Sequence, residues 1–250
     1  MIKYKSAREI ALMREAGRLV AEALSLAETL VRPGVTTGAI DGEMEKFVRA
    51  REGTLLFKGY KGFPASICAS VNEEVVHGIP GQRVLLEGDV VSIDCGVRLH
   101  GYCSDSAVTL PVGRVSPAAG LLQVTRSALE AGIAAMGPGR RLSEVSAAVQ
   151  DHAESRGYSV VRSLVGHGIG TALHEEPQVP NFVSRGRGAF DMVLRPGLVL
   201  AVEPMLNAGT HEVELLPNHW TYVTRDRALS AHFEHTVAIR ENGAEVLTLP

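Results

Sequence analysis

The stretch that decides the fold is residues 88–110, GDVVSIDCGVRLHGYCSDSAVTL. Runs rich in β-branched and apolar residues at 90–97 and 102–110 predict two strands, and Arg-Leu-His-Gly at 98–101 is typical of a turn. We therefore expect an antiparallel hairpin around which the rest of the chain is organised.

Two acidic residues on this hairpin suggest chemistry. If Leu99 and His100 form a two-residue loop, Asp94 lies directly opposite Asp105, with Cβ atoms about 4.5–5.5 Å apart. Two carboxylates so close in an apolar sheet repel each other, so that one must be protonated or a cation must lie between them. The alternative is that both side chains face water, as acids on strands usually do.

Composition excludes several classes of partner. The chain has 250 residues, with 25 basic and 28 acidic side chains and no basic block, so we expect neither nucleic acid nor a membrane surface as a partner. The first residues, MIKYKSAREIALMREAG, have no apolar signal core, and no uncharged run approaches the ~20 residues of a membrane span. Three cysteines at no zinc-finger spacing favour reduced thiols, and hence a cytoplasmic protein.

Helices are expected on both sides of the hairpin. The capping box at residues 6–9 predicts a helix that runs to about residue 30, before Pro33-Gly34. Ser116-Pro117 is typical of a further helix start. The other expected elements are helices 37–50, 116–136 and 142–156, a strand and turn within 64–76, and strands 159–165, 199–203, 221–224, 233–240 and 245–249.

The element order repeats itself. Each half has two helices followed by strands, and each half brings acids to similar strand positions. The matched positions are Pro33-Gly34, Gly53, Gly88 and Asp94 with Pro138-Gly139, Gly157, Gly197 and Glu203, followed by Asp105 and Glu234. We interpret the chain as one α+β domain, 1–250, with an internal pseudo-repeat of about 10–112 and 117–249 whose seam collects four carboxylates. A chance coincidence of glycines is the alternative.

Histidines join these acids in the second half, in GHGIGTALHEEP at 166–177. A lone histidine is more often structural, but His167 and His174 occur among glycines together with the four acids. Four carboxylates and one imidazole suit Mn²⁺, Fe²⁺, Co²⁺ or Zn²⁺ better than a thiolate site would. Two divalent ions balance four carboxylates, whereas one ion leaves about −2 of buried charge.

Six motifs carry a resemblance to a known family: NEEVVHGIP (72–80), SIDCG (92–96), YCSDSA (102–107), GHGIGTALHEEPQV (166–179), VEPML (202–206) and SAHFEHTV (230–237). In this order they resemble the type I methionine aminopeptidases, metalloproteases with the pita-bread fold, in which two pseudo-two-fold related αα-β halves surround a curved antiparallel sheet. The resemblance implies removal of the initiator methionine from nascent polypeptides with small second residues.

The resemblance also implies a metal site. Asp105 and Glu234 would bridge two divalent ions (Co, Mn, Fe, Ni or Zn), Asp94 would complete one of them, and His167 with Glu203 would complete the other. A hydroxide activated by the two ions would attack the first peptide bond.

Three side chains have catalytic roles by the same resemblance. His174 would donate to the carbonyl oxygen, His77 would contact the amide or pass a proton to the leaving nitrogen, and Glu203 would accept the proton of the water. A simple turn histidine is the alternative for His77.

A pocket for the methionine side chain is expected at the family's pocket positions, Tyr60, Phe63, Cys68 and Trp220, although apolar residues often only pack. The chain departs from the bacterial pattern at Leu173, often Phe, and at Phe57 and Lys61, often Cys and His. These departures bear on specificity and not on the reaction.

The remaining cysteines and histidines have no expected role. Cys95 should face away from the acids by strand alternation, and Cys103 lies on the face of Asp105, but packing is the better interpretation for both. Surface placement is expected for His100, His152, His211, His219, His232 and His235.

Two other functions compete with the leading one. An X-Pro aminopeptidase or creatinase relative shares the fold, but those chains have an additional N-terminal domain, whereas helices are expected here from Ser6. A catalytically silent peptide-binding module is the second, although complete ligands argue against it. We expect the N-terminal peptide of nascent proteins as partner, the ribosome as a further candidate, and a monomer.

Overall fold

The computed structural model describes residues 1–114, 118–183 and 191–250. Within these ranges lie four α-helices, α1 (Ala7–Leu30), α2 (Thr37–Arg49), α3 (Ala119–Ala134) and α4 (Leu142–Glu154), and a short 3₁₀ turn, η1 (Tyr60–Gly62). The strands of the first half are β1 (Thr54–Leu55), β2 (Cys68–Val71), β3 (Glu74–Val76), β4 (Val90–Leu99) and β5 (Tyr102–Pro111). Those of the second half are β6 (Ser159–Val160), β7 (Gly166–Gly168), β8 (Glu175–Val179), β9 (Val199–Val202), β10 (Met205–Asn207), β11 (Val213–Leu215), β12 (Tyr222–Thr224), β13 (Ser230–His232), β14 (His235–Arg240) and β15 (Gly243–Val246).

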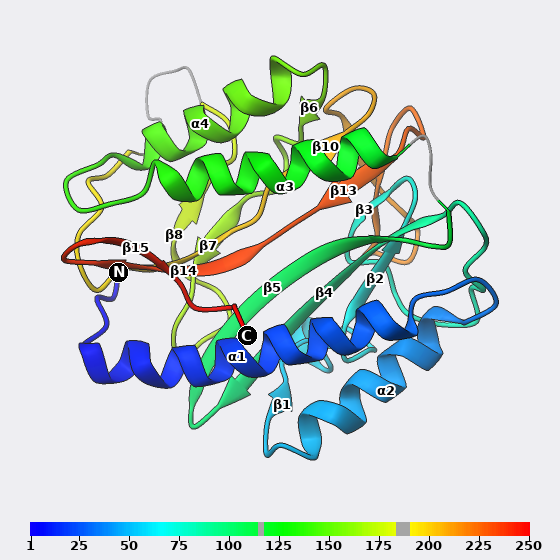
Figure 1. Cartoon of the computed structure of the whole chain (residues 1–250), viewed down its shortest axis with the longest axis horizontal. Coiled ribbons are helices and arrows are strands. Elements are labelled where there is room, and N and C mark those ends of the chain that lie inside the picture. Colours follow the sequence, from blue (N-terminus) through cyan, green and yellow to red (C-terminus); the bar gives the residue numbers. More distant parts are fainter. Residues whose placement is uncertain (115–117, 184–190) are drawn as a thin grey trace.

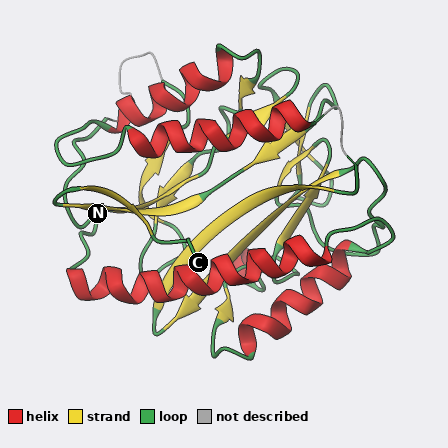
Figure 2. Cartoon of the chain, in the orientation of Figure 1, coloured by secondary structure: helices red, strands yellow, loops and turns green. Residues whose placement is uncertain are grey.

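The strands form antiparallel sheets, and in the view of Figure 1 the helices lie in front of them, one helix pair along each edge. The largest sheets have the order β1-β4-β2, with β5 paired to β4, and β15-β14-β9-β7-β8. Smaller sheets have the orders β13-β10-β6 and β11-β12-β3. In Figure 1 the pair α1–α2 lies on one side of the strands and the pair α3–α4 on the other, and Figure 2 shows the strands between and behind them. The predicted α+β class is therefore confirmed.

Local sequence explains where the helices begin and end. The hydroxyl of Ser6 accepts the backbone N–H of Glu9 at 3.3 Å, and the Glu9 carboxylate accepts the N–H of Ser6 at 2.7 Å, so the predicted capping box is present. The ends of α1, α2 and α4 lie within two residues of the prediction. The expected start of α3 at Ser116-Pro117 lies outside the described residues, and α3 is described from Ala119.

The predicted register of the central hairpin is wrong by two residues. The loop is His100-Gly101, so that Leu99 pairs with Tyr102. Both loop residues have positive φ, 50° and 84°, as a type I′ turn requires, and glycine favours its second position. Asp105 consequently lies opposite Gly96 rather than opposite Asp94.

Several strands of the second half are shorter than predicted. The segment expected as a strand over 159–165 pairs only at Ser159–Val160. The strand expected from residue 233 begins at His235, because the backbone N–H of Glu234 turns to the carbonyl of Ala107 on β5, at 3.0 Å. That change of partner joins the two halves.

Equivalent backbone bonds occur in both halves. The N–H of Gly34 donates to the carbonyl of Leu85 at 2.8 Å, and the N–H of Gly139 donates to the carbonyl of Leu194 at 2.9 Å. Both glycines have positive φ, 88° and 82°, which side-chain-bearing residues rarely adopt. These are the contacts that two copies of one αα-β unit would make.

The hydroxyl of Thr236 forms hydrogen bonds between the two halves of the chain. The hydroxyl of Thr236 on β14 accepts the backbone N–H of Asp105 at 2.9 Å and donates to its carbonyl at 2.8 Å. On β5, Ser104 turns the other way and donates to the carbonyl of Met13 on α1 at 2.7 Å. Asp105 therefore points to the sheet face that the helices leave uncovered.

None of the described helices combines the length and the apolar character needed to cross a bilayer.

Candidate active site

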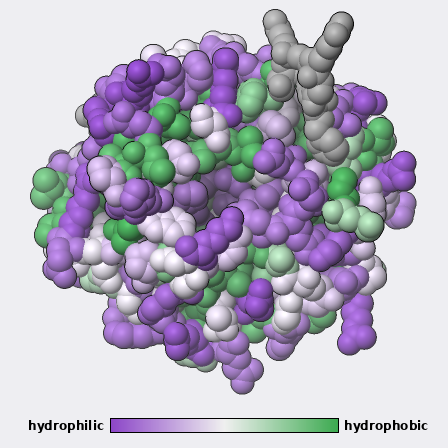
Figure 3. All heavy atoms as spheres, turned by 180° about the vertical axis from the view of Figure 1, so that it is seen from behind, coloured by the Kyte–Doolittle hydropathy of each residue, from purple (hydrophilic) through white to green (hydrophobic). Residues whose placement is uncertain are grey.

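All the predicted ligand, catalytic and pocket side chains line one cavity. Figure 3 views the molecule from the side opposite to Figure 1, where the surface is hollowed near its middle. The residues that line the cavity are Phe57, Tyr60, Lys61, Phe63, Cys68, His77, Asp94, Asp105, His167, Leu173, His174, Glu203, Trp220 and Glu234. The structure thus brings together positions as distant in sequence as Phe57 and Glu234.

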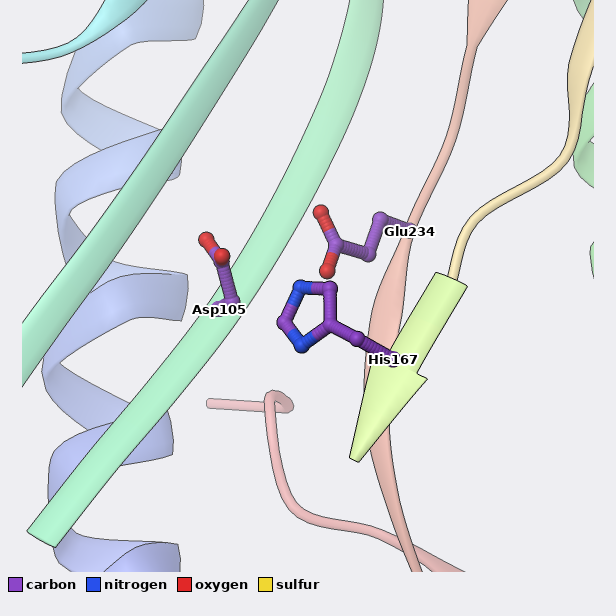
Figure 4. A group of neighbouring side chains, drawn as sticks. All are labelled: Asp105, His167 and Glu234. Carbon is purple, nitrogen blue, oxygen red and sulfur yellow. The ribbon is translucent and has the colours of Figure 1, made fainter. Parts of the chain in front are cut away.

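A group of potential metal ligands lies at the centre of this cavity. Ligand atoms of Asp105, His167 and Glu234 all lie within 4.8 Å of one another (Figure 4). Glu203 places Oε1 3.6 Å from Nε2 of His167. Asp94 comes from β4, two residues from the partner of Asp105 and on the same face of the hairpin.

The chemistry of these side chains fits divalent cations. Asp94 Oδ1, Asp105 Oδ1 and Glu234 Oε1 are buried without a hydrogen-bond partner among the described residues. Burial raises the pKa of Asp105 to about 7. Burial together with neighbouring carboxylates raises the pKa of the other three well above their usual values. Since unpaired buried charge is costly, cations bound to these oxygens would stabilise the cluster.

His167 has the tautomer that a metal ligand needs. Its Nδ1 lies 2.9 Å from the carbonyl of Gly168, which can only accept, so Nδ1 carries the proton and Nε2 presents a lone pair. Burial lowers the pKa of His167 to about 3, so the ring is neutral near pH 7. The imidazole is therefore preorganised to bind a cation.

Glycines on both sides of His167 make room for its strand. A Cβ at Gly166 would collide with the carbonyl oxygen of Ala201 on β9, and a Cβ at Gly168 would collide with that of Glu176 on β8. These are the close backbone approaches expected from the Gly-His-Gly motif. They seat β7 tightly between its neighbours.

His174 lies at the more exposed side of the cavity. Its Nδ1 is 2.9 Å from the hydroxyl of Tyr60, and the two rings stack with centroids 5.3 Å apart. Partial burial, followed by the charge of Lys61, lowers the pKa of His174. A neutral ring that accepts the Tyr60 hydroxyl at Nδ1 carries its proton on Nε2.

An ion pair holds the turn that carries His174. Lys5 donates to the carboxylate of Glu175 at 2.9 Å, and each side chain is 5% exposed. The same carboxylate accepts the backbone N–H of Thr171 at 3.2 Å. The N-terminal segment thereby fixes the loop beside His174.

His77 has an unusual backbone conformation for a non-glycine residue, with φ 58°. The hydroxyl of Thr221 donates to its carbonyl at 3.2 Å. Burial, followed by repulsion from His174 when that ring is protonated, lowers the pKa of His77 to about 4. The ring is a neutral group at the cavity wall.

The apolar part of the cavity comes from a separate cluster of side chains. Phe63 and Trp220 meet edge to face with centroids 5.1 Å apart. Phe57, Cys68 and Leu173 belong to the same cluster and are almost fully buried. Burial and neighbouring Asp94 raise the pKa of the Cys68 thiol, so the residue acts as a small apolar group.

The other two cysteines pack, as expected. Cys95 lies in the main hydrophobic core and faces away from the acids. Cys103 is fully buried in the cluster that contains Phe57 and Phe63, and it does not line the cavity.

The prediction of surface placement is wrong for His232. The residue is 2% exposed, and its Nε2 lies 3.9 Å from Oε2 of Glu203. Its position two residues before Glu234 would have indicated this, because alternate residues of an extended chain share a face. His235, also expected on the surface, is half-buried and bonds through Nδ1 to Thr248 at 2.8 Å.

Comparisons with known proteins show the family of the chain. Residues 11–241 match the model of metallopeptidase family M24. The chain is 49% identical to the methionine aminopeptidase of Clostridium acetobutylicum, over 100% of this chain and 99% of that one, and 49% identical to methionine aminopeptidase 1 of Bacillus subtilis, over 99% of each. The crystal structure of methionine aminopeptidase from Thermotoga maritima superposes with a TM-score of 0.96 at 43% identity, over 100% of both chains. The chain therefore belongs to metallopeptidase family M24, among the methionine aminopeptidases that share its pita-bread fold.

Proposed function

We propose that this protein removes the N-terminal methionine from nascent polypeptides with small second residues. The observation that carries the proposal is one cavity in which five candidate metal ligands, three of them clustered, adjoin an apolar wall and two neutral histidines. An unbranched thioether fits that wall, and a peptide bond next to it would face the cluster.

Five side chains would hold two divalent ions. Asp105 and Glu234 would bridge them, Asp94 would complete one ion, and His167 with Glu203 the other. Such ions would supply a water that ionises near neutral pH and a Lewis acid for the scissile carbonyl. Mn²⁺, Fe²⁺, Co²⁺, Ni²⁺ and Zn²⁺ are all compatible with this ligand set.

The protein's own groups would move the protons. The Glu203 carboxylate, whose pKa burial raises, would accept the proton of the attacking water. His174, with its proton on Nε2, would donate to the carbonyl oxygen as negative charge develops there. His77 would contact the amide and assist proton transfer to the leaving nitrogen.

Specificity would come from the apolar wall. Phe57 and Leu173 are buried in it, and Lys61 lies at the rim, with its ammonium 5.4 Å from the centroid of the Tyr60 ring. These three side chains would tune the affinity for methionine and the tolerance of larger second residues. We further propose that the chain acts in the cytoplasm as a monomer on peptides that emerge from the ribosome.

Two tripeptides test the proposal. Purified protein with Mn²⁺ or Co²⁺ should release methionine from Met-Ala-Ser and leave Ala-Pro-Ala intact. Cleavage of Ala-Pro-Ala alone would favour an X-Pro aminopeptidase. Cleavage of neither peptide by metal-loaded protein would favour a silent binding module and contradict the proposal.

A further inference from the structure

His232 is a buried histidine next to the candidate metal cluster. It ends β13, and its side chain points to the same sheet face as that of Glu234. The residue between them, Phe233, points to the opposite face, where the guanidinium of Arg126 on α3 lies 5.1 Å from its ring centroid.

The backbone of His232 is held firmly. Its N–H donates to the hydroxyl of Thr109 at 2.8 Å, and that hydroxyl donates back to its carbonyl at 2.8 Å. Its Cα pairs with that of Met205 on β10. The backbone that carries the ring is therefore held by two neighbouring strands, β5 and β10.

The ring itself has no hydrogen bond within the described parts of the chain. Both Nδ1 and Nε2 are buried and unpartnered there. A buried polar atom without a partner costs about 1–3 kcal/mol, so such a group usually serves a purpose. An apolar side chain at this position would avoid that cost.

The carboxylate of Glu203 lies beside the His232 ring. Its two oxygens face two different imidazoles: Oε1 lies 3.6 Å from Nε2 of His167, and Oε2 lies 3.9 Å from Nε2 of His232. The second distance is about 1 Å longer than a hydrogen bond, and small torsional changes of a Glu side chain cover such a gap.

We propose that His232 is a positioning residue that donates from Nε2 to Oε2 of Glu203 and leaves Oε1 directed, beside His167, at a metal ion. Groups that hydrogen-bond to a ligating carboxylate fix its orientation, and their loss typically lowers metal affinity about 10–100-fold. The inference rests on the proposed metal site, and it concerns only the ion on the side of His167 and Glu203.

Metal binding without substrate tests the role. Metal-free wild type, His232→Leu and His232→Gln are titrated with Mn²⁺ by calorimetry, and circular dichroism confirms that each is folded. Leucine has about the size of histidine but no donor, whereas glutamine keeps a donor at similar reach. His235→Gln is the matched control, because His235 is a neighbouring buried histidine whose Nδ1 bonds to Thr248, away from the cavity.

We expect His232→Leu to bind one Mn²⁺ about 10–100-fold more weakly, and His232→Gln to bind within a few-fold of wild type, as should His235→Gln. In metal-loaded protein, kcat for Met-Ala-Ser should fall in the leucine variant with little change in KM, and it should recover with glutamine. The visible spectrum of the Co²⁺ form should change only in the leucine variant.

Two results would overturn the inference. Wild-type affinity in His232→Leu would show that Glu203 needs no such donor. Equal weakening by leucine and glutamine would show that the imidazole itself is required, as a direct ligand would be. If His232→Leu does not fold, His232→Asn, whose side chain is shorter, replaces it in the comparison with His232→Gln, and the same two outcomes decide. Because no peptide is present in the titration, these outcomes are readable even if wild type fails to cleave Met-Ala-Ser.

Discussion

Three neutral imidazoles surround the candidate ligands, and each is defined by what its nitrogens contact. The Gly168 carbonyl can only accept, so it leaves Nε2 of His167 as a lone pair, whereas a Tyr60 hydroxyl that donates to Nδ1 of His174 leaves Nε2 of that ring protonated. The same side-chain type thus provides an electron-pair donor in one place and a proton donor in another. In the proposed mechanism, this difference separates metal binding from carbonyl activation at the level of single residues.

Removal of His174 should lower turnover and spare the metal. In His174→Ala we expect kcat for Met-Ala-Ser to fall about 10²-fold or more, the usual effect of losing one donor to a developing oxyanion. Mn²⁺ affinity should be unchanged, because His174 is not among the proposed ligands. Steady-state kinetics and calorimetry on His174→Ala and on the control His211→Ala check this, and loss of metal from the former would refute the assignment.

Most of this site was predictable residue by residue. Asp94, Asp105 and Glu234 stand in short motifs whose spacing carries chemical meaning. His232 was missed because a histidine outside any recognised ligand pattern resembles a surface residue until the strand that carries it is placed against β5 and β10. Its place two residues before Glu234 indicates the shared face, but the extent of its burial depends on packing between distant segments, which local sequence does not encode.

At the scale of elements, turn chemistry and seam contacts decide where the acids lie. The sequence indicated a two-residue loop, but it did not distinguish Leu99-His100 from His100-Gly101, and only the second places glycine at the second left-handed position. Because side chains alternate along a strand, an error of two residues in the pairing leaves each side chain on the face where it was predicted. The acids were therefore predicted on the correct face in the wrong register.

The hydroxyl of Thr236 should contribute more to stability and metal binding than the size of its side chain does. Thr236→Val removes both bonds to the backbone of Asp105 and leaves a buried N–H and carbonyl unsatisfied, which costs about 1–3 kcal/mol. For a chain of this length each kcal/mol lowers the unfolding temperature by about 2–4 °C. Displacement of Asp105 should also weaken Mn²⁺ binding.

Thermal unfolding of metal-free protein and calorimetry with Mn²⁺ measure the two effects, and Thr236→Ser, which keeps the hydroxyl, is the control. An unfolding temperature and an Mn²⁺ affinity in Thr236→Val that equal those of wild type would contradict the role of this seam.

At the scale of the whole molecule, two αα-β halves meet where neither could bury its acids alone. Asp105 comes from the first half and Glu234 from the second, and a backbone bridge between Ala107 and Glu234 joins them. Gly34 and Gly139, which the sequence predicted as equivalent positions of an internal repeat, make equivalent backbone bonds. The pairing of strands across the seam is not visible in the sequence, because it depends on contacts between residues more than 100 positions apart.

Four buried acids should make the metal-free protein less stable as the pH rises. Burial raises the pKa of Asp105 from 3.8 to about 7. Burial and neighbouring carboxylates raise the pKa values of Asp94, Glu203 and Glu234 well above their usual values. A raised pKa means that the folded state holds a proton that the unfolded chain has lost, so the stability present at low pH is lost as the pH rises through the folded value.

The buried histidines have lowered pKa values and act in the opposite direction, but only below about pH 6.5. Calorimetry of chelated protein from about pH 6.5 to about pH 8, through the folded pKa of Asp105, should therefore show a falling unfolding temperature. Mn²⁺ should reverse that fall, and Asp105→Asn should flatten it. A metal-free protein that is equally stable across this range would contradict the description of the cluster.

The central claim is that these five side chains hold the catalytic ions, and the most direct test measures metal content and Met-Ala-Ser hydrolysis on the same samples. Chelated wild type and chelated Glu234→Ala receive Mn²⁺ stepwise, and mass spectrometry gives the bound metal at each step. We expect no hydrolysis by chelated protein, a return of hydrolysis as wild type binds up to two ions per chain, and neither bound metal nor activity in Glu234→Ala. Hydrolysis by metal-free wild type, or a Glu234→Ala variant that retains both metal and activity, would contradict the claim that these five side chains hold the catalytic ions.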